Sequence, residues 1–202
     1  MTEYLQYIVF VGMAVQLIGI ASYIKETIKG NTKPNRVSWL MWAIAPIIAS
    51  FAAMANGVEW AVLPVFMSGF APLLVFIASF VNKNSYWKLE RFDYLCGLFS
   101  VLALILWAMT KNATIAIAFA IASDGFASIP TVIKLWKYKE TETVDAYKAG
   151  LFNSLTSFFA IKTWNFSSYG FPIYLVTINI VFIFCFYKSE LLKKYLSFSK
   201  QS

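Results

Sequence analysis

The sequence predicts an all-α integral membrane protein with seven transmembrane helices in a 3+1+3 arrangement. The first observation is composition: of 202 residues, 59% are hydrophobic and only 13% are charged, which is too apolar for the surface of a soluble domain. The second is a series of seven apolar stretches, each close to the roughly 20 residues that a helix needs to cross a bilayer. The third is an internal repeat. Together they predict two parallel triple-helix bundles joined by a linker helix.

Only helices are expected in these stretches, because backbone groups in lipid must be satisfied within their own segment. The predicted spans are residues 4–27, 37–56, 59–81, 92–110, 113–136, 146–163 and 168–187. The fifth span is the least apolar of the seven, and the sixth is the shortest.

The repeat has a constant register. Three pairs of residues are each separated by 108 positions: Gln16 and Asp124, Trp39 and Tyr147, and Pro64 and Pro172. A fixed register favours two copies of one structural unit. Copies of three spans would point in opposite directions if joined directly, so a fourth span between them restores a parallel arrangement. The expected units are a first bundle at 1–82, a linker helix at 83–111, a second bundle at 112–190 and a basic tail at 191–202.

Positive charge predicts the orientation. Of the 17 lysine and arginine residues, only Lys111 and Lys162 fall in loops on one side of the predicted spans, and the rest fall on the other side. Loops rich in Lys and Arg stay in the cytoplasm. We therefore expect the N-terminus outside and the C-terminus in the cytoplasm, in the cell (inner) membrane. The net charge of +7 is explained by these loops, so no nucleic-acid partner is expected.

The sequence gives little indication of a metal site or a disulfide bond. Cys96 and Cys185 lie in separate spans without CxxC spacing and are expected to be packed side chains. The chain has no histidine, which is the commonest metal ligand and general base. We expect no metal site and no cofactor.

Asp124 is the first candidate functional residue. It falls near the middle of the fifth predicted span, where an acidic side chain costs at least about 2.5–3.5 kcal/mol on insertion scales. Desolvation favours the protonated carboxyl group, so Asp124 could bind a proton or pair with a cationic substrate. The simpler alternative is a structural hydrogen bond to Ser128, one turn on, or to Gln16 in the other copy.

Polar groups in other spans suggest a substrate cavity. Asn153 and Ser157 lie in the short sixth span, and Gln16 lies in the first. A buried amide offers donors and an acceptor to a polar solute, although hydrogen bonding between helices is the alternative. Trp39 and Trp42 share one helical face, where substrate stacking competes with an interfacial anchoring role.

Two prolines are candidate hinges. Proline interrupts helical hydrogen bonding and permits kinks, which would let part of a bundle swing. Pro46 and Pro130 are assigned this role, whereas structural kinking suffices for Pro64 and Pro172. The mixed-charge segment 137–145, KYKETETVD, is expected to be a solvated connector.

The segment 128–145, SIPTVIKLWKYKETETVD, resembles the motif of the SWEET and PQ-loop (MtN3-like) transporter superfamily, in which proline precedes a helical turn and a basic, Ser/Thr-acidic loop. The family's glutamine after proline is Thr131 here, and Ser22-Tyr23 replaces Pro-Gln in the first copy. The resemblance implies a 3+1+3 carrier fold. It also implies a substrate role for Asn153, proton coupling through Asp124, and hinges at Pro46 and Pro130.

These observations lead us to expect a secondary transporter or facilitator of a small polar solute, such as a sugar, an amino acid or a vitamin, working by alternating access. The alternative is a membrane receptor or sensor on the same fold that binds a small ligand without net transport. No enzyme is expected, because Asp124 is the only carboxylate deep in a predicted span and has no partner for acid–base chemistry. The expected partners are the solute and the lipid bilayer, and homo-oligomerisation is left open.

Overall fold

The computed structural model describes residues 4–85, 87–110 and 112–199, and within these residues the regular secondary structure is helical. The described residues form seven α-helices: α1 (Ile8–Lys29), α2 (Arg36–Ala55), α3 (Val62–Ala78), α4 (Arg91–Thr110), α5 (Ala113–Lys137), α6 (Asp145–Thr156) and α7 (Phe166–Ser199). Short 3₁₀ helices lie at Leu5–Tyr7, Lys83–Ser85, Lys139–Thr141 and Ser157–Ala160. The predicted all-α class is confirmed, and so is the number of helices.

Five of the helical segments are long and apolar enough to cross a membrane: Leu5–Lys29, Arg36–Ala55, Arg91–Thr110, Thr114–Lys137 and Phe166–Lys188. A sixth, Val62–Ala78, is apolar but shorter. Large hydrophobic side chains face outward from these helices, among them Ile18, Phe51, Leu98 and Phe184. By length and hydropathy, this is a transmembrane helical protein.

The sixth helix is shorter than the predicted span 146–163. It leaves the α conformation after Thr156 and ends in a 3₁₀ turn. Two of its hydroxyl groups bond to nearby backbone carbonyls: Ser154 Oγ donates to Gly150 O at 2.7 Å, and Thr156 Oγ1 donates to Asn153 O at 2.6 Å. Such local bonds compete with regular helix and weaken its continuation.

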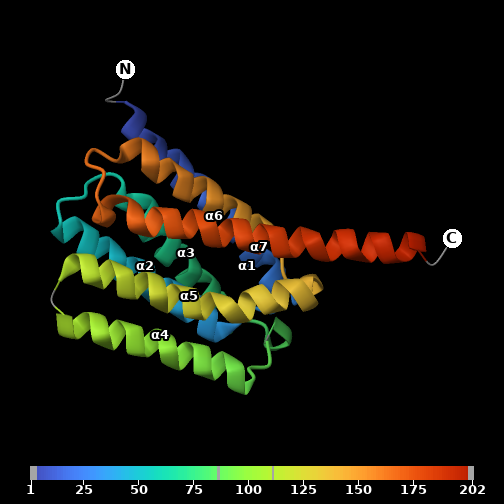
Figure 1. Ribbon diagram of the computed structural model, residues 1–202. Helices are drawn as coiled ribbons and strands as arrows, with labels where there is room; N and C mark the ends of the chain where they lie inside the picture. The colour runs from blue at the N-terminus through green and yellow to red at the C-terminus, as the bar shows by residue number, and fades with distance from the viewer. Residues whose placement is uncertain (1–3, 86, 111, 200–202) are drawn as a thin grey trace.

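The seventh helix is longer than predicted. It runs without interruption to Ser199 and includes most of the expected tail 191–202, of which residues 200–202 lie outside the described part. Figure 1 shows α7 projecting beyond the other helices toward the C-terminus. Lys111, one of the two basic residues expected on the opposite side, also lies outside the described residues.

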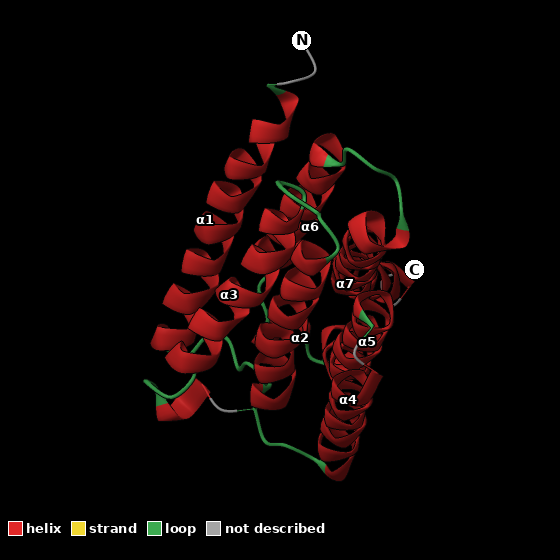
Figure 2. Cartoon of the chain, turned by 90° about the vertical axis from the view of Figure 1, so that its left-hand side faces the viewer, coloured by secondary structure: helices red, strands yellow, loops and turns green. Residues whose placement is uncertain are grey.

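The packing of the first three helices is repeated by the last three. Helix α3 lies against α1 and α2, and α7 lies against α5 and α6. Across the middle, α1 packs on α6 and α2 packs on α5, which are equivalent contacts under the 108-residue register. Helix α4 lies on the outer side of α5, at the edge of the bundle (Figures 1 and 2).

Glycines permit a close approach across this middle interface. A Cβ atom at Gly19 of α1 would overlap the side chain of Ala149 and lie 2.9 Å from the carbonyl oxygen of Asp145. Gly12 faces Thr156 and Asn153 in the same way. Small residues that let helix backbones meet are typical of packing within membranes.

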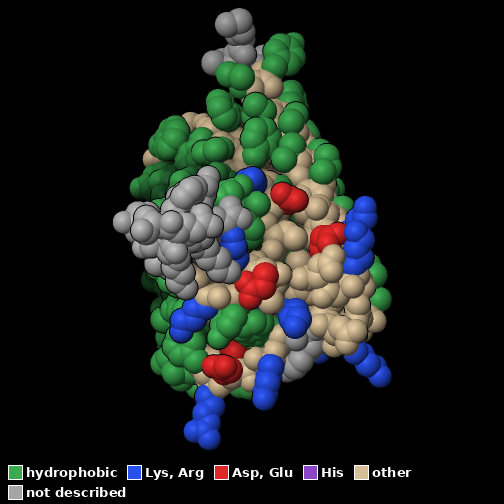
Figure 3. Space-filling model, turned by 90° about the vertical axis from the view of Figure 1, so that its right-hand side faces the viewer, with side chains coloured by type: hydrophobic (Ala, Val, Ile, Leu, Met, Phe, Trp, Pro, Cys, Tyr) green, Lys and Arg blue, Asp and Glu red, His purple; other side chains and the backbone are tan. Residues whose placement is uncertain are grey.

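The two ends of the bundle differ in charge. We call one of them the basic end, because it carries Lys25, Lys29, Lys33, Arg36, Lys83, Lys88, Arg91, Lys134, Lys137, Lys139, Lys148 and Lys188. Figure 3 views this end and shows Lys and Arg side chains around it with acidic side chains between them. The opposite end carries Glu59 and Lys162.

Candidate functional site

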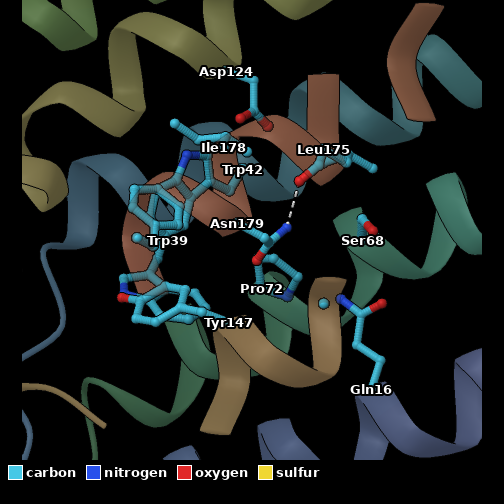
Figure 4. A pocket seen from close by; sticks show the side chains of 12 residues that line it. Gln16, Trp39, Trp42, Ser68, Pro72, Asp124, Tyr147, Leu175, Ile178 and Asn179 are labelled. Carbon is cyan, nitrogen blue, oxygen red and sulfur yellow. Dashed lines mark hydrogen bonds between the residues drawn. The ribbon is translucent and has the colours of Figure 1, made fainter. Parts of the chain in front are cut away.

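A cavity of about 60 Å³ lies inside the bundle, between the first three helices and the last three. It takes its walls from α1, α2, α3, α5, α6 and α7, and its lining residues are Gln16, Trp39, Trp42, Ser68, Pro72, Asp124, Tyr147, Gly150, Leu175, Ile178, Asn179 and Phe182 (Figure 4). The lining contains both members of two repeat pairs, Gln16 with Asp124 and Trp39 with Tyr147.

Four of the predicted site residues line the cavity: Gln16, Trp39, Trp42 and Asp124. A fifth, Asn153, lies directly behind Gln16. Its Nδ2 donates to Gln16 Oε1 and to the carbonyl oxygen of Pro64, the latter at 2.8 Å. Ser157 is not brought to the cavity: it is buried in the 3₁₀ turn after α6 and is not a lining residue.

Asp124 is buried, with 3% of its surface exposed, and has a partner that the sequence did not predict. The hydroxyl group of Tyr174 on α7 donates to Asp124 Oδ1 at 2.6 Å. The predicted alternative of a bond to Gln16 is wrong, because the two side chains lie at opposite ends of the cavity (Figure 4). The sequence feature that could have indicated this bond is the presence of Tyr174 in an apolar span, because a buried tyrosine hydroxyl group needs a hydrogen-bond partner.

Ser128 joins Asp124 to the aromatic wall. Its Oγ donates to the backbone oxygen of Asp124 at 2.9 Å and accepts from Trp42 Nε1 at 3.0 Å. The expected contact between Ser128 and Asp124 is therefore present, but it uses the backbone of Asp124. The side chain of Asp124 accepts from Tyr174.

Aromatic rings form one wall of the cavity in a continuous chain. Ring centroids are 5.2 Å apart for Trp39 and Trp42, 5.3 Å for Trp42 and Phe182, and 4.8 Å for Phe182 and Tyr147. Trp39 and Trp42 are both buried in the bundle, so the interfacial anchoring role is wrong for them. Both remain available to a solute.

A buried charged cluster separates the cavity from the basic end. We call it the Glu142 cluster, and its members are Tyr23, Lys134, Glu142 and Tyr147. Lys134 Nζ lies 2.5 Å from Glu142 Oε1, and the side chains of both residues are 1% exposed. The hydroxyl groups of Tyr23 and Tyr147 donate to Glu142 Oε2 at 2.8 and 2.9 Å.

The segment 137–145 is a largely exposed connector, as predicted, but the burial of Glu142 was not predicted. Glu142 is turned inward, where it joins α1, α5 and α6. Lys134 Nζ also donates to the carbonyl oxygen of Lys33 and lies 4.8 Å from the ring centroid of Trp87. The sequence of this segment shows only alternating charges. The same pattern is found in a fully solvated loop and in a loop in which one carboxylate is buried.

Weaker contacts close the opposite end. Lys162 Nζ lies 2.6 Å from Glu59 Oε2, but the two side chains are 60% and 58% exposed. Nearby, Asn56 Nδ2 donates to Ser167 Oγ at 2.7 Å. A second cavity of about 230 Å³ lies at this end, lined by residues 56–59, 61, 160–163, 165 and 168.

An apolar layer separates the two cavities. It contains Val62, Val65, Ile117 and Phe171, which belong to one buried cluster with several alanines of α2. These residues line a small gap of about 10 Å³. The central cavity is therefore bounded by apolar side chains on this side and by a polar cluster on the other.

The two predicted hinge prolines lie in helices that continue through them. Pro46 is buried in α2, one turn after Trp42, and its carbonyl oxygen accepts from Ser50 Oγ at 2.7 Å. Pro130 is buried in α5, one turn before Lys134. Each proline thus stands between the cavity wall and one end of its helix, where a missing helical hydrogen bond permits bending.

The described residues contain no group of three or more His, Cys, Asp or Glu side chains that could hold a metal ion. The central cavity is lined by one carboxyl group, two side-chain amides, two hydroxyl groups, aromatic rings and aliphatic side chains. Comparison with protein-family models, with curated proteins and with solved structures found no match to this chain.

Proposed function

We propose that this protein is a secondary carrier that moves a small polar solute across the cell membrane by alternating access. The main support for this proposal is the central cavity, whose walls come from both halves of the repeat. It is lined by both members of two repeat pairs, Gln16 with Asp124 and Trp39 with Tyr147. A site between repeats that can move against each other is the arrangement used by secondary transporters.

The proposal includes the 3+1+3 architecture of the SWEET and PQ-loop superfamily. In it, α1–α3 form one triple-helix bundle, α5–α7 form the other, and α4 is the linker. The equivalent contacts of the two halves support this division. The excess of basic residues at one end supports an orientation with the C-terminus in the cytoplasm.

The size of the cavity fits a closed intermediate of the cycle. About 60 Å³ is enough for a few water molecules, whereas sites for drug-sized ligands measure roughly 300–1,000 Å³. The two bundles must therefore separate at one end to admit a solute. Bending at Pro46 and Pro130 would supply this movement.

The ion pairs at the two ends of the bundle differ in how much free energy it costs to break them. Glu142 and Lys134 are buried with their hydrogen bonds filled, and separating such a pair leaves an uncompensated charge. The pair Glu59–Lys162 is exposed, and such pairs contribute about 0–1 kcal/mol. Of the two ion pairs, the one at the end opposite the basic end is therefore the easier to separate.

The proposal is tested by counterflow in liposomes. Purified protein is reconstituted, loaded with an unlabelled sugar, amino acid, nucleoside or vitamin, and assayed for uptake of the labelled compound. In the Gly19→Leu variant, the larger side chain would push α1 away from α6. Saturable counterflow in the wild type that is lost in this variant supports a carrier. Tight binding of a solute without counterflow would instead favour the receptor or sensor.

Proton coupling through Asp124 needs a separate measurement. Uptake by the wild type and by Asp124→Asn is compared with and without a pH gradient across the liposome membrane. A gradient that drives uptake in the wild type but not in the variant supports coupling. An unchanged response in the variant would remove coupling from the proposal and leave a uniporter.

A further inference from the structure

The central cavity contains one carboxyl group and no basic side chain among the described residues. Asp124 is the only charged residue among the described residues that line it, and none of them is Lys or Arg. Lys134, which is buried elsewhere in the fold, is already paired with Glu142 and bonded to Lys33 O. Because a buried carboxylate is costly unless it is paired, ionisation of Asp124 is favoured when a cation binds beside it in the cavity.

The partner of Asp124 does not supply a positive charge. The Tyr174 hydroxyl group donates one neutral hydrogen bond to Oδ1, and Ser128 bonds to the backbone oxygen. Figure 4 shows the carboxyl group at one end of the cavity, with its oxygens directed toward the interior. A solute in the cavity therefore meets the carboxyl group directly.

The wall beside Asp124 suits an organic cation. Trp42 lines the cavity and is held near Asp124 through Ser128, and the ring of Phe182 follows it. The negative face of an aromatic ring attracts ammonium and guanidinium groups. Leu175 and Ile178 extend the same space with apolar surface.

The far end of the cavity is polar but neutral. Gln16 uses its Oε1 for Asn153, which leaves its NH₂ group for a solute. Asn179 uses its Nδ2 for Leu175 O at 2.8 Å, which leaves its Oδ1. Ser68 adds a hydroxyl group. This end can bind a hydroxyl or amide group but offers no positive charge to balance a carboxylate or a phosphate.

We propose that the transported solute is an organic monocation with an ammonium or guanidinium group at Asp124, an apolar or aromatic body along the Trp42 wall, and a neutral hydrogen-bonding group at Gln16. The inference rests on the proposed carrier function. It excludes anions and disfavours zwitterions, because nothing in the cavity balances a second carboxylate.

Three matched probes test the assignment of charge. Tyramine has an ammonium group, a ring and a hydroxyl group; tyrosol replaces the ammonium by a hydroxyl; tyrosine adds a carboxylate. Binding of each to the full-length protein in nanodiscs is measured by calorimetry. We expect tyramine to bind about 10- to 100-fold more tightly than tyrosol or tyrosine, the range that a hydrogen bond between charged groups supplies.

Variants of one residue show whether Asp124 is the cause. Asp124→Asn keeps an acceptor for Tyr174 and should abolish the preference for tyramine, whereas Asp124→Glu should retain it. Glu59→Gln, at the exposed opposite end, should leave it unchanged. Equal binding of tyramine and tyrosol by the wild type, or an undiminished preference in Asp124→Asn, overturns the inference.

The failure of this inference and the failure of the carrier proposal give different results. If the protein catalyses counterflow of a neutral solute but does not prefer tyramine, the cationic substrate is ruled out and the carrier function is supported. A proton would then be the charge that balances Asp124. If the protein prefers tyramine in the binding assay but shows no counterflow of tyramine, the cation-binding site is supported and the carrier function is ruled out.

Discussion

The hydroxyl group of Tyr174 on α7 donates a hydrogen bond of 2.6 Å to Asp124 on α5. The two positions equivalent to these residues in the first half are Phe66 and Gln16, which cannot make this bond with a carboxylate. The halves thus share a backbone arrangement while differing in the chemistry of the site. The second half supplies the charge, and the first supplies the amide at the far end of the cavity.

Removing the hydroxyl group should therefore affect the site more than the fold. Tyr174→Phe leaves Asp124 Oδ1 without its donor, and a buried polar group that loses its partner costs about 1–3 kcal/mol. We expect a lower melting temperature in detergent and slower counterflow of the transported solute. Tyr94→Phe, which alters an exposed ring on α4, is the matched control and should change neither.

The Glu142 cluster gives a prediction about stability. Glu142→Gln leaves the ammonium group of Lys134 buried without its counter-charge, and breaking a buried pair in this way costs about 3–5 kcal/mol. Adding Lys134→Met removes the stranded charge, so the double variant should unfold at a higher denaturant concentration than Glu142→Gln alone. Glu59→Gln breaks only an exposed pair and should cost no more than about 1 kcal/mol. Additive effects of the two cluster substitutions would contradict the pairing.

Much of the fold could be predicted because lipid imposes strong constraints. Seven apolar stretches, a constant register and the distribution of lysine and arginine led to seven helices with repeated contacts. The lengths of α6 and α7 could not be predicted from apolarity. They depend on hydroxyl groups such as that of Ser154 bonding to the backbone, and on a polar stretch remaining helical after Tyr187.

The candidate site was only partly visible in the sequence. Asp124, Gln16 and Trp42 stood out because polar or aromatic residues in an apolar span are unusual, and all three line the cavity. Tyr174 and Glu142 did not stand out, because a tyrosine in a span and a glutamate in a loop are both ordinary. Their roles come from pairing over 50 and 119 positions of the chain, with Asp124 and Tyr23, which local spacing does not encode.

The closures at the two ends can be tested by thiol labelling. In a variant with Cys96 and Cys185 replaced by serine, Ser68→Cys places a reactive group in the cavity wall, and a membrane-impermeant maleimide reports access from each side. Adding Glu142→Gln should speed labelling from the basic end, because the carboxylate that holds Tyr23, Lys134 and Tyr147 is gone. Adding Lys162→Glu should speed it from the opposite end. If either change raised labelling equally from both sides, the two closures would not be separate gates.

The interface between α1 and α6 gives the last prediction, because it joins the two halves. A Cβ atom at Gly19 would overlap Ala149 and lie 2.9 Å from the backbone oxygen of Asp145, which cannot move without moving α6. Gly125 of α5 has room, since the nearest atom is the Tyr174 hydroxyl oxygen at 3.9 Å.

Both glycines are helical, so alanine should gain up to about 1 kcal/mol of helix propensity at either position. At Gly19 that gain is opposed by overpacking, which costs about 1–3 kcal/mol. We expect Gly19→Ala to lower the melting temperature and slow counterflow, and Gly125→Ala to preserve or raise both. Equal melting temperatures for the two variants would mean that α1 and α6 can separate without cost. The contact could not then be the surface that holds the two halves of the protein together.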